Sequence, residues 1–518
     1  MQHSRRRFIQ KTLLSVPALS SLAACGGGGG SASATANSAT TGAQAGGSSS
    51  TPFALSGKDP STGLTQLGTT LVNYSPLAKP AKLQTVLDPD FGNKITRITD
   101  AQGDWNSSFA IPAYPTTQAW NCDESLMILY VSDSLGTGGH DDSFALMDGR
   151  SYKFITFLDI NPADVEQWYW STTDPTALFY VDNNQRSGTQ ANALTKATIT
   201  ASAKDSSGTI TAVTMTTTVL HDFADDFKPG GALYNAVKGC GTITAVSGGE
   251  DPFAMSEDND LIGLGAYLNK NLNDSAVYAA FSYRISTNTI GQSFETSADV
   301  PQAMPSGRQT YFYKNETAVY TMNPVTNAVA QTLSYDGTQH SDMLRNAAGD
   351  DVVAGPQFDG PGTNATLLVQ NLTQGGVPKV IIPDYPPSGT LLSGRAYKVP
   401  GWVGMAMIGC PSGTNGTCNT KNQSVAAAQP KTYLDQEVLI ANVDTGEVYR
   451  VAHHRSTGNY GNSSSSNYWA QPNVTMSPSG TRILFQSDWG AANPKSITMP
   501  NDKAIVDTYV IELPAYSA

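Results

Sequence analysis

The sequence predicts an all-β fold, a single seven-bladed β-propeller over residues 75–516. The first observation is a strand–turn–strand phrase that recurs seven times, typified by Gln471–Gly490 with its Pro-Ser-Gly turn. The second is the composition, because the chain has 48 Gly and 29 Pro but only 14% charged residues, as turn-rich β proteins do. The alternative is a pair of β-sandwiches, but sandwiches would not explain seven copies of one phrase.

The beginning of the chain predicts export and a lipid anchor. Residues 1–25 form a signal, in which Ser4–Gln10 matches the twin-arginine consensus and an apolar segment too short to span a bilayer follows. Cys25 ends a lipobox-like sequence and is the predicted lipidation site, with an incidental cysteine after a plain cleaved signal as the alternative. Residues 26–52 are rich in Gly, Ser and Ala and predict a flexible tether. We therefore expect a periplasmic or outer-membrane-anchored bacterial lipoprotein, attached to the membrane through its lipid alone.

The seven phrases differ in length but share an apolar second strand after the turn. In chain order they are Gln118–Tyr130, Glu166–Tyr180, Glu250–Ile262, Gln302–Tyr313, Gln339–Val353, Ser393–Met405 and Gln471–Gly490. Outer strands are expected at Phe154–Ile160 and within Val438–Ala452, and a last strand at Thr508–Leu513. Ile95–Thr99 reads as a strand without a blade of its own. We expect it to pair with the last blade, so that N-terminal and C-terminal strands close the ring.

Charge and cysteine content limit the partners. The net charge of −12 argues against nucleic acid as a partner. We also expect the protein to be a monomer. Cys410 and Cys418 flank a polar loop and predict a local disulfide, whereas Cys122 and Cys240 are candidates for a pair only by elimination. A cysteine-ligated metal is the poorer interpretation, because no Cys-x-x-Cys spacing occurs.

Three of the phrases carry a resemblance to known proteins. Pro115–Ser125, Asp164–Pro175 and Tyr468–Gly480 resemble blade signatures of bacterial propeller polysaccharide lyases of the oligogalacturonate-lyase and ulvan-lyase types. The resemblance spans most of the propeller and implies action on acidic polysaccharide by β-elimination. The oligogalacturonate-lyase type holds a divalent metal with histidines just ahead of the last Ser-Pro-x-Gly, where this chain has Gln471 and Asn473. Amides are poor ligands for Mn²⁺, so we expect no metal or other cofactor, and leave open a weak Ca²⁺ site.

Polar residues near the start of each phrase are the candidate lining of the central channel. They are Gln118, Glu166, Glu250, Gln302, His340, Arg395 and Gln471. Together with Trp120, Trp168 and Trp469 as aromatic platforms, they predict a sugar-binding funnel at one mouth of the ring. The alternative for each aromatic residue is packing of blade against blade.

A lyase acting on a uronic acid needs a cation, a base and an acid. Arg395 is the predicted cation, because arginine engages a carboxylate bidentately. His340 or His140 is the predicted base, and Tyr397 or Tyr460 the predicted acid. The alternatives are a structural hydrogen bond for His340 and a solvated loop position for His140. A non-catalytic carbohydrate-binding or scaffold propeller is the rival function, favoured by the missing metal histidines and the negative charge.

Overall fold

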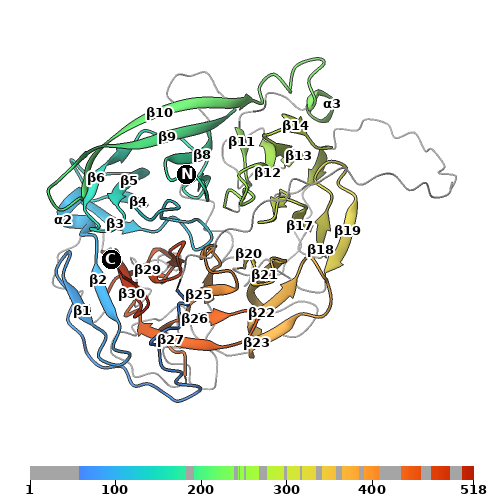
Figure 1. Ribbon diagram of the computed structural model, residues 1–518. Coiled ribbons are helices and arrows are strands. Elements are labelled where there is room, and N and C mark those ends of the chain that lie inside the picture. The colour runs from blue at the N-terminus through green and yellow to red at the C-terminus, as the bar shows by residue number, and fades with distance from the viewer. Residues whose placement is uncertain are drawn as a thin grey trace, which may run out of the picture.

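The protein is a seven-bladed β-propeller in which seven antiparallel sheets follow one another around a ring (Figure 1). The computed structural model describes residues 58–517 except 183–191, 239–242, 244, 250–251, 268–276, 297–299, 315–317, 334–340, 358–364, 384–389, 408–432, 457–467 and 490–504. The predicted fold class is confirmed. The repeated phrase predicts it because each copy contributes the second strand of one blade, from β4 in blade 1 to β29 in blade 7.

Six blades are each built from one continuous stretch of chain. From the channel outward, the strands of blade 1 are β3 (Ser107–Ile111), β4 (Leu126–Ser134), β5 (Ser143–Asp148) and β6 (Phe154–Leu158), and those of blade 2 are β7 (Trp168–Trp170), β8 (Ala177–Asp182), β9 (Ala193–Lys204) and β10 (Ile210–Asp222). Blade 3 consists of β11 (Ala245–Ser247), β12 (Leu261–Tyr267), β13 (Val277–Arg284), β14 (Thr289–Ile290) and β15 (Phe294–Thr296), and blade 4 of β16 (Gln302–Ala303), β17 (Thr310–Lys314), β18 (Ala318–Met322) and β19 (Val329–Leu333). Blade 5 consists of β20 (Asp342–Arg345), β21 (Asp351–Gln357), β22 (Ala365–Asn371) and β23 (Lys379–Pro383), and blade 6 of β24 (Thr390–Ser393), β25 (Trp402–Met407), β26 (Glu437–Asn442) and β27 (Val448–His453).

Blade 7 joins the two ends of the chain. It consists of β28 (Val474–Met476), β29 (Arg482–Ser487), β30 (Asp507–Glu512), β2 (Lys94–Arg97) and β1 (Thr85–Leu87). Ile95 of β2 lies opposite Ile511 of β30, and both side chains are fully buried in one apolar cluster with Ile483. Figure 1 shows β2 beside β30. The predicted closure is therefore confirmed, and the pairing leaves neither β2 nor β30 as an open sheet edge.

Helices contribute little to this architecture. Within the described residues the α-helical segments are α2 (Ala101–Trp105) and α3 (Tyr234–Val237), and a 3₁₀ turn, η2 (Tyr468–Ala470), precedes β28. Asp100 caps α2 by accepting a hydrogen bond from the backbone N–H of Gly103. Across the ranges that the structure describes, no helix has both the length and the apolar character needed to cross a membrane.

The turn between the first and second strands of each blade, here called the inner turn, links every blade to the next. All seven inner turns lie on one face of the ring, the inner-turn face. Hydrogen bonds join blades 1 and 2 (Asn121 Nδ2 to Pro175 O), blades 2 and 3 (Thr172 Oγ1 to Glu257 O) and blades 3 and 4 (Glu257 N to Pro305 O). Further bonds join blades 4 and 5 (Ser306 N to Asp351 Oδ1), blades 6 and 5 (Gly401 N to Arg345 O), blades 6 and 7 (Lys398 N to Pro478 O) and blades 7 and 1 (Ser479 N to Glu124 Oε1). This closed circuit fixes the positions of the side chains that the inner turns carry.

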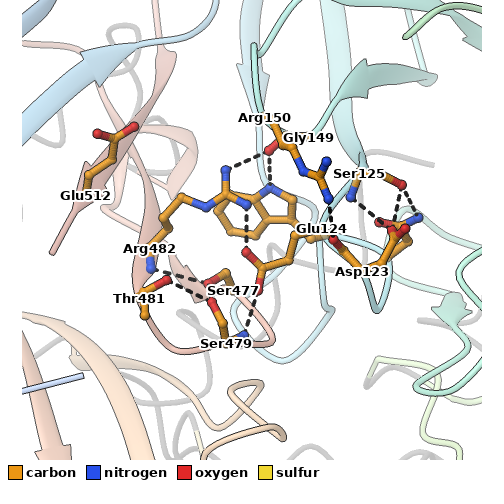
Figure 2. Close-up of polar contacts among 12 residues, drawn as sticks. Asp123, Glu124, Ser125, Gly149, Arg150, Ser477, Ser479, Thr481, Arg482 and Glu512 are labelled. Carbon is orange, nitrogen blue, oxygen red and sulfur yellow. Dashed lines mark hydrogen bonds and ion pairs between the residues drawn. The ribbon is translucent and has the colours of Figure 1, made fainter. Parts of the chain in front are cut away.

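A buried ion pair reinforces the junction of blade 7 with blade 1. Arg482 of β29 donates to Glu124 Oε2 at 2.7 Å and to the carbonyl of Gly149 at 2.7 Å (Figure 2). The guanidinium also lies over the rings of Trp120 and Tyr516, 4.9 and 4.8 Å from their centroids. Arg482 Nε has no hydrogen-bond partner among the described residues, but the carboxylate of Glu124 and the carbonyl of Gly149 offset the cost of burying the guanidinium.

The prediction placed the first strand of blades 1, 3 and 6 too late in the sequence, because β11 of blade 3 already ends at Ser247 and β24 of blade 6 at Ser393. In blade 1, β3 ends at Ile111, and the chain then makes an excursion over residues 112–119 before Trp120 rejoins the ladder opposite Met127. Gln118, at the end of this excursion, donates to the carbonyls of Arg395 and Met476 at 2.9 Å each. The excursion therefore crosses to blades 6 and 7, and Gln118 lies toward the inner turns rather than at the start of a strand.

Candidate active site on the inner-turn face

The structure separates the predicted catalytic residues. Arg395 and Tyr397 lie in the inner turn of blade 6, whereas His140 lies in the loop between β4 and β5, at the opposite end of the blades. The His140 ring stacks on Phe157, with centroids 4.2 Å apart. His140 therefore cannot serve as base beside Arg395, which corrects that prediction.

Several predicted residues fall outside the described part of the chain. They are Cys25, Glu250, His340, Cys410, Cys418 and Tyr460, so the lipidation, the disulfide and two of the catalytic assignments stay predictions. Cys122 is described and is a free, buried thiol, whereas its candidate partner Cys240 lies outside the described residues. Burial raises the pKa of the Cys122 thiol to about 11, which keeps it protonated and unreactive at neutral pH.

Arg395 is already neutralised by a carboxylate of the neighbouring blade. Its Nε donates to Asp342 Oδ2 at 2.9 Å, its Nη2 pairs with Asp342 Oδ1, and Nη2 also donates to the carbonyl of Met343 at 2.7 Å. Asp342 is 3% exposed and also accepts the backbone N–H of Gly394. The guanidinium therefore fastens the inner turn of blade 6 to blade 5 and is not free to bind a substrate carboxylate, contrary to its predicted role.

The three tryptophans predicted as aromatic platforms differ in burial. Trp120 and Trp168 are buried, at 0% and 1% exposure, and Trp168 Nε1 donates to the carbonyl of Val165 at 2.8 Å. These two rings pack inside the propeller, which agrees with the alternative prediction that they pack blade against blade. Trp469 is partly exposed and stacks on Phe109 with centroids 4.6 Å apart, on the face opposite to the inner turns.

Two predicted polar residues differ in exposure. Glu166 is buried, at 3% exposure, just ahead of β7, whereas Gln471 is partly exposed just ahead of β28. Both stand at the start of the first strand of their blade, as predicted. They therefore lie at the end of the channel away from Gln118 and Arg395, so the predicted set of polar residues does not share one mouth.

The inner-turn face brings together a different set of chemically active side chains. Glu257 comes from the inner turn of blade 3, Arg345 from the end of β20, Tyr169 from β7 and Tyr397 from blade 6. Glu257 Oε2 lies 4.0 Å from Arg345 Nη1, and the two side chains are 15% and 28% exposed. The backbone of Glu257 is fixed on both sides, because its N–H donates to Pro305 and its carbonyl accepts from Thr172.

Burial tunes the acid–base properties of this cluster. Removal from water raises the pKa of Glu257 to about 7, although Arg345 and Arg395 act in the opposite direction. Burial likewise raises the pKa values of Tyr169 and Tyr397, so both phenols stay protonated at neutral pH. The Tyr397 hydroxyl is buried and has no hydrogen-bond partner. The cluster thus combines a carboxyl that ionises near neutrality, a partly exposed cation and an unpaired phenol, which is the profile of a functional site.

A narrow crevice between blades 5 and 6 borders the cluster. It is lined by Leu344, Arg345, Gly394, Ala396, Tyr397, Pro400, Gly401 and Trp402, and it is too narrow to hold a water molecule. A ligand would therefore reach Arg345, the partly exposed cation of the cluster, from the inner-turn face rather than through the crevice.

Sequence reasoning missed Glu257 and Arg345, although both lie inside predicted phrases. The prediction took the residue that begins each phrase, because a strand start was expected to face the channel. The inner turn of each phrase predicts the position of these two side chains better than the start of the phrase does. Glu257 directly follows Ser256 at the turn of the third phrase, and Arg345 immediately precedes the Asn346–Gly349 turn of the fifth.

One further cluster has the composition of a metal site. Asp88, Asp90 and His453 offer ligand atoms within 4.8 Å of one another. However, Arg455 Nη2 lies 3.5 Å from Asp88 and 3.8 Å from Asp90, and His453 Nδ1 already bonds Asp90 at 3.0 Å. A buried guanidinium that neutralises both carboxylates does not fit a divalent cation. The cluster instead fastens the segment before β2 to β27.

Comparisons with known proteins return solved structures alone. No protein-family model and no curated protein matches the chain. An oligogalacturonate lyase in complex with manganese is 12% identical, with a TM-score of 0.49 over 85% of this chain and 99% of that one. An oligogalacturonate lyase from Vibrio parahaemolyticus is 11% identical, with a TM-score of 0.45 over 83% and 96%.

A third solved structure is that of a WD40 domain. The Neurospora crassa Pan2 WD40 domain is 9% identical, with a TM-score of 0.36 over 81% of this chain and 98% of that one. Likenesses this low carry no argument about activity. The propeller architecture rests on the strand pairing of this chain itself.

Proposed function

We propose that this protein is an exported, surface-tethered propeller that acts on acidic polysaccharide as a β-eliminating lyase, with its site on the inner-turn face. The observation that carries the proposal is the convergence of Glu257, Arg345 and Tyr397. These three side chains come from blades 3, 5 and 6 and supply a base, a cation and an acid. The twin-arginine signal and lipobox support export and tethering, and the net charge of −12 speaks against nucleic acid.

Each side chain has a defined part in the elimination. Arg345 binds the uronate carboxylate and makes the neighbouring C–H acidic. Glu257, as the carboxylate, removes that proton, and the C–H electron pair becomes the new carbon–carbon double bond. The bond to the glycosidic oxygen breaks, and Tyr397 protonates the leaving oxygen. Arg395 holds the turn that carries Tyr397 and does not touch the substrate.

A non-catalytic carbohydrate-binding propeller is the second candidate. The observation in its favour is the crevice beside Tyr397, which is too narrow to admit a sugar ring. The pairing of Arg395 with Asp342 also removes one cation from the mouth. In this case Arg345 would still attract a uronate carboxylate, but no bond would break.

Ultraviolet absorbance of unsaturated uronates separates the two candidates. The full-length protein is incubated at pH 8 with pectin, ulvan, alginate and glucuronan, alongside Glu257→Gln and the matched control Glu447→Gln, which changes an exposed glutamate on a turn of blade 6. The proposal expects absorbance to rise with at least one polymer, to fall at least 100-fold in Glu257→Gln and to stay unchanged in the control. No rise with any polymer, together with retention on an affinity gel, would establish the binder instead.

A further inference from the structure

Two cations on the inner-turn face have no partner for their charge. Arg308 lies in the inner turn of blade 4 and is exposed, and Lys398 lies in the inner turn of blade 6 and is partly exposed. Among the described residues, neither side chain makes an ion pair or a hydrogen bond, and both residues bond only through their backbone N–H groups. The chain has 43 acidic residues for 31 lysines and arginines, so carboxylates to pair with are abundant. The two unpaired cations are therefore available to an acidic ligand.

Arg308 and Arg345 lie near the same buried carboxyl group. Asp351 of β21 is 2% exposed and accepts a hydrogen bond from the backbone N–H of Ser306 at 2.9 Å. Burial raises the pKa of Asp351, and the bonds from Ser306 and the charges of the two guanidiniums oppose that rise. Both cations therefore belong to the junction of blades 4 and 5. The exposed carboxylate of Asp258 lies beside the inner turn of blade 4, so the basic stretch ends there.

Lys398 lies on the other side of the channel mouth. Its backbone N–H donates to the carbonyl of Pro478 in blade 7 at 3.0 Å. Burial raises the pKa of the Cys122 thiol and the Lys398 ammonium opposes that rise, so the ammonium lies near the inner turn of blade 1. The Tyr397 phenol lies near the same thiol, which adds to the effect of burial on the pKa of that phenol. Lys398 is thus on the side of the proposed proton donor, across the mouth from blades 4 and 5.

We propose that Arg308 and Lys398 form two carboxylate subsites that flank Arg345, so that the inner-turn face takes a run of consecutive uronates. The central uronate binds Arg345, as in the proposed function on which this inference rests. The sugar that carries the departing oxygen lies toward Tyr397 and hence toward Lys398, and the sugar on the other side lies toward Arg308.

The spacing of carboxylates along the polymer decides how well it fits the three cations. A polymer with a carboxylate on every residue pairs all of them at once. A polymer in which uronates alternate with neutral sugars leaves both flanking cations unpaired. The substrate class of the site is therefore a homopolyuronate.

Isothermal titration calorimetry of the full-length Glu257→Gln variant tests the two subsites, because this variant leaves the sugar chain intact. The probes are hexamers of galacturonate, mannuronate and glucuronate, together with the three monosaccharides. We expect at least one hexamer to bind, and Arg308→Gln and Lys398→Gln each to raise its Kd at least fivefold. Neither change should affect binding of the monosaccharide, which occupies Arg345 alone. Lys204→Gln is the matched control and should leave Kd unchanged, because Lys204 is an exposed cation on the outer hairpin of blade 2.

The outcomes distinguish failure of the subsites from failure of the lyase proposal. Lack of binding by all three hexamers would overturn the subsites, and so would a hexamer Kd that both substitutions leave within twofold. Equal weakening in Lys204→Gln would also overturn them, because it would reflect net charge rather than position. In each of these cases the absorbance assay still decides whether elimination occurs. Hexamer binding that depends on Arg308 and Lys398, without any elimination, would keep the subsites and overturn the lyase.

Discussion

At the scale of single residues, the decisive quantity is the charge state of Glu257. Its pKa is raised to about 7 by burial, so the carboxylate needed as base forms only as pH rises through neutrality. We expect the elimination rate to climb about tenfold per pH unit below pH 7 and to level off above it. A pH–rate profile measured by absorbance checks this. A rate that is already maximal at pH 5 would assign the proton abstraction to another group.

The same raised pKa predicts a pH-dependent stability. A carboxyl whose pKa is higher in the folded than in the unfolded state stabilises the fold below about pH 4, and this contribution is lost as pH rises through about 7. Glu257→Gln cannot ionise, so its stability relative to the parent should increase between pH 5 and pH 8, by at most about 3 kcal/mol. Urea unfolding at the two pH values measures it, with Glu447→Gln as the control. An unchanged difference would mean that Glu257 keeps an ordinary pKa.

The buried pair at the ring junction gives a second prediction at this scale. Glu124→Gln leaves the Arg482 guanidinium, which is 1% exposed, without its carboxylate. Loss of one partner of such a pair costs about 3–5 kcal/mol. Chemical denaturation should show this loss, whereas Glu447→Gln, at an exposed position of blade 6, should stay within about 0.5 kcal/mol. Equal stability of the two variants would show that the pair does not hold the junction.

At the scale of elements, ring closure depends on β2. Ile95→Ala truncates a fully buried side chain on β2, which pairs with β30 of blade 7. This change should lower the free energy of unfolding by about 2–5 kcal/mol. Leu87→Ala, on the neighbouring strand β1, is the matched control, because Leu87 is 60% exposed. Thermal and urea unfolding compare the two. A similar small effect in both would mean that the N-terminal strand is not needed for closure.

The elements also show where sequence reasoning succeeds and where it ends. Second strands such as β29 could be predicted because a continuous apolar run is typical of a strand that is covered on both faces. The strand that contains Ile95 could be assigned to blade 7 because it had no blade of its own and the last blade would otherwise end in an open edge. The first strand of blade 1 was misplaced, because the excursion over residues 112–119 depends on bonds from Gln118 to blades 6 and 7. Contacts between residues more than 270 positions apart leave no local signal.

At the scale of the whole molecule, the ring brings together a cluster of side chains that no local pattern contains. Glu257, Arg345 and Tyr397 lie in three phrases, and only the closed circuit of inner turns brings them to one face. The sequence predicted the architecture, but it assigned the cation of the proposed site to Arg395. That error arose because the pairing of Arg395 with Asp342 joins two blades and is invisible before the fold is known.

The central claim is that the inner-turn face binds an acidic sugar for elimination. A crystal structure of Glu257→Gln with a bound oligouronate tests it most directly, because the variant retains the site but cannot remove the proton. We predict that the uronate carboxylate binds Arg345 and that the scissile oxygen lies near the Tyr397 hydroxyl. An oligouronate bound on the opposite face beside Trp469, with the inner-turn face empty, would contradict it.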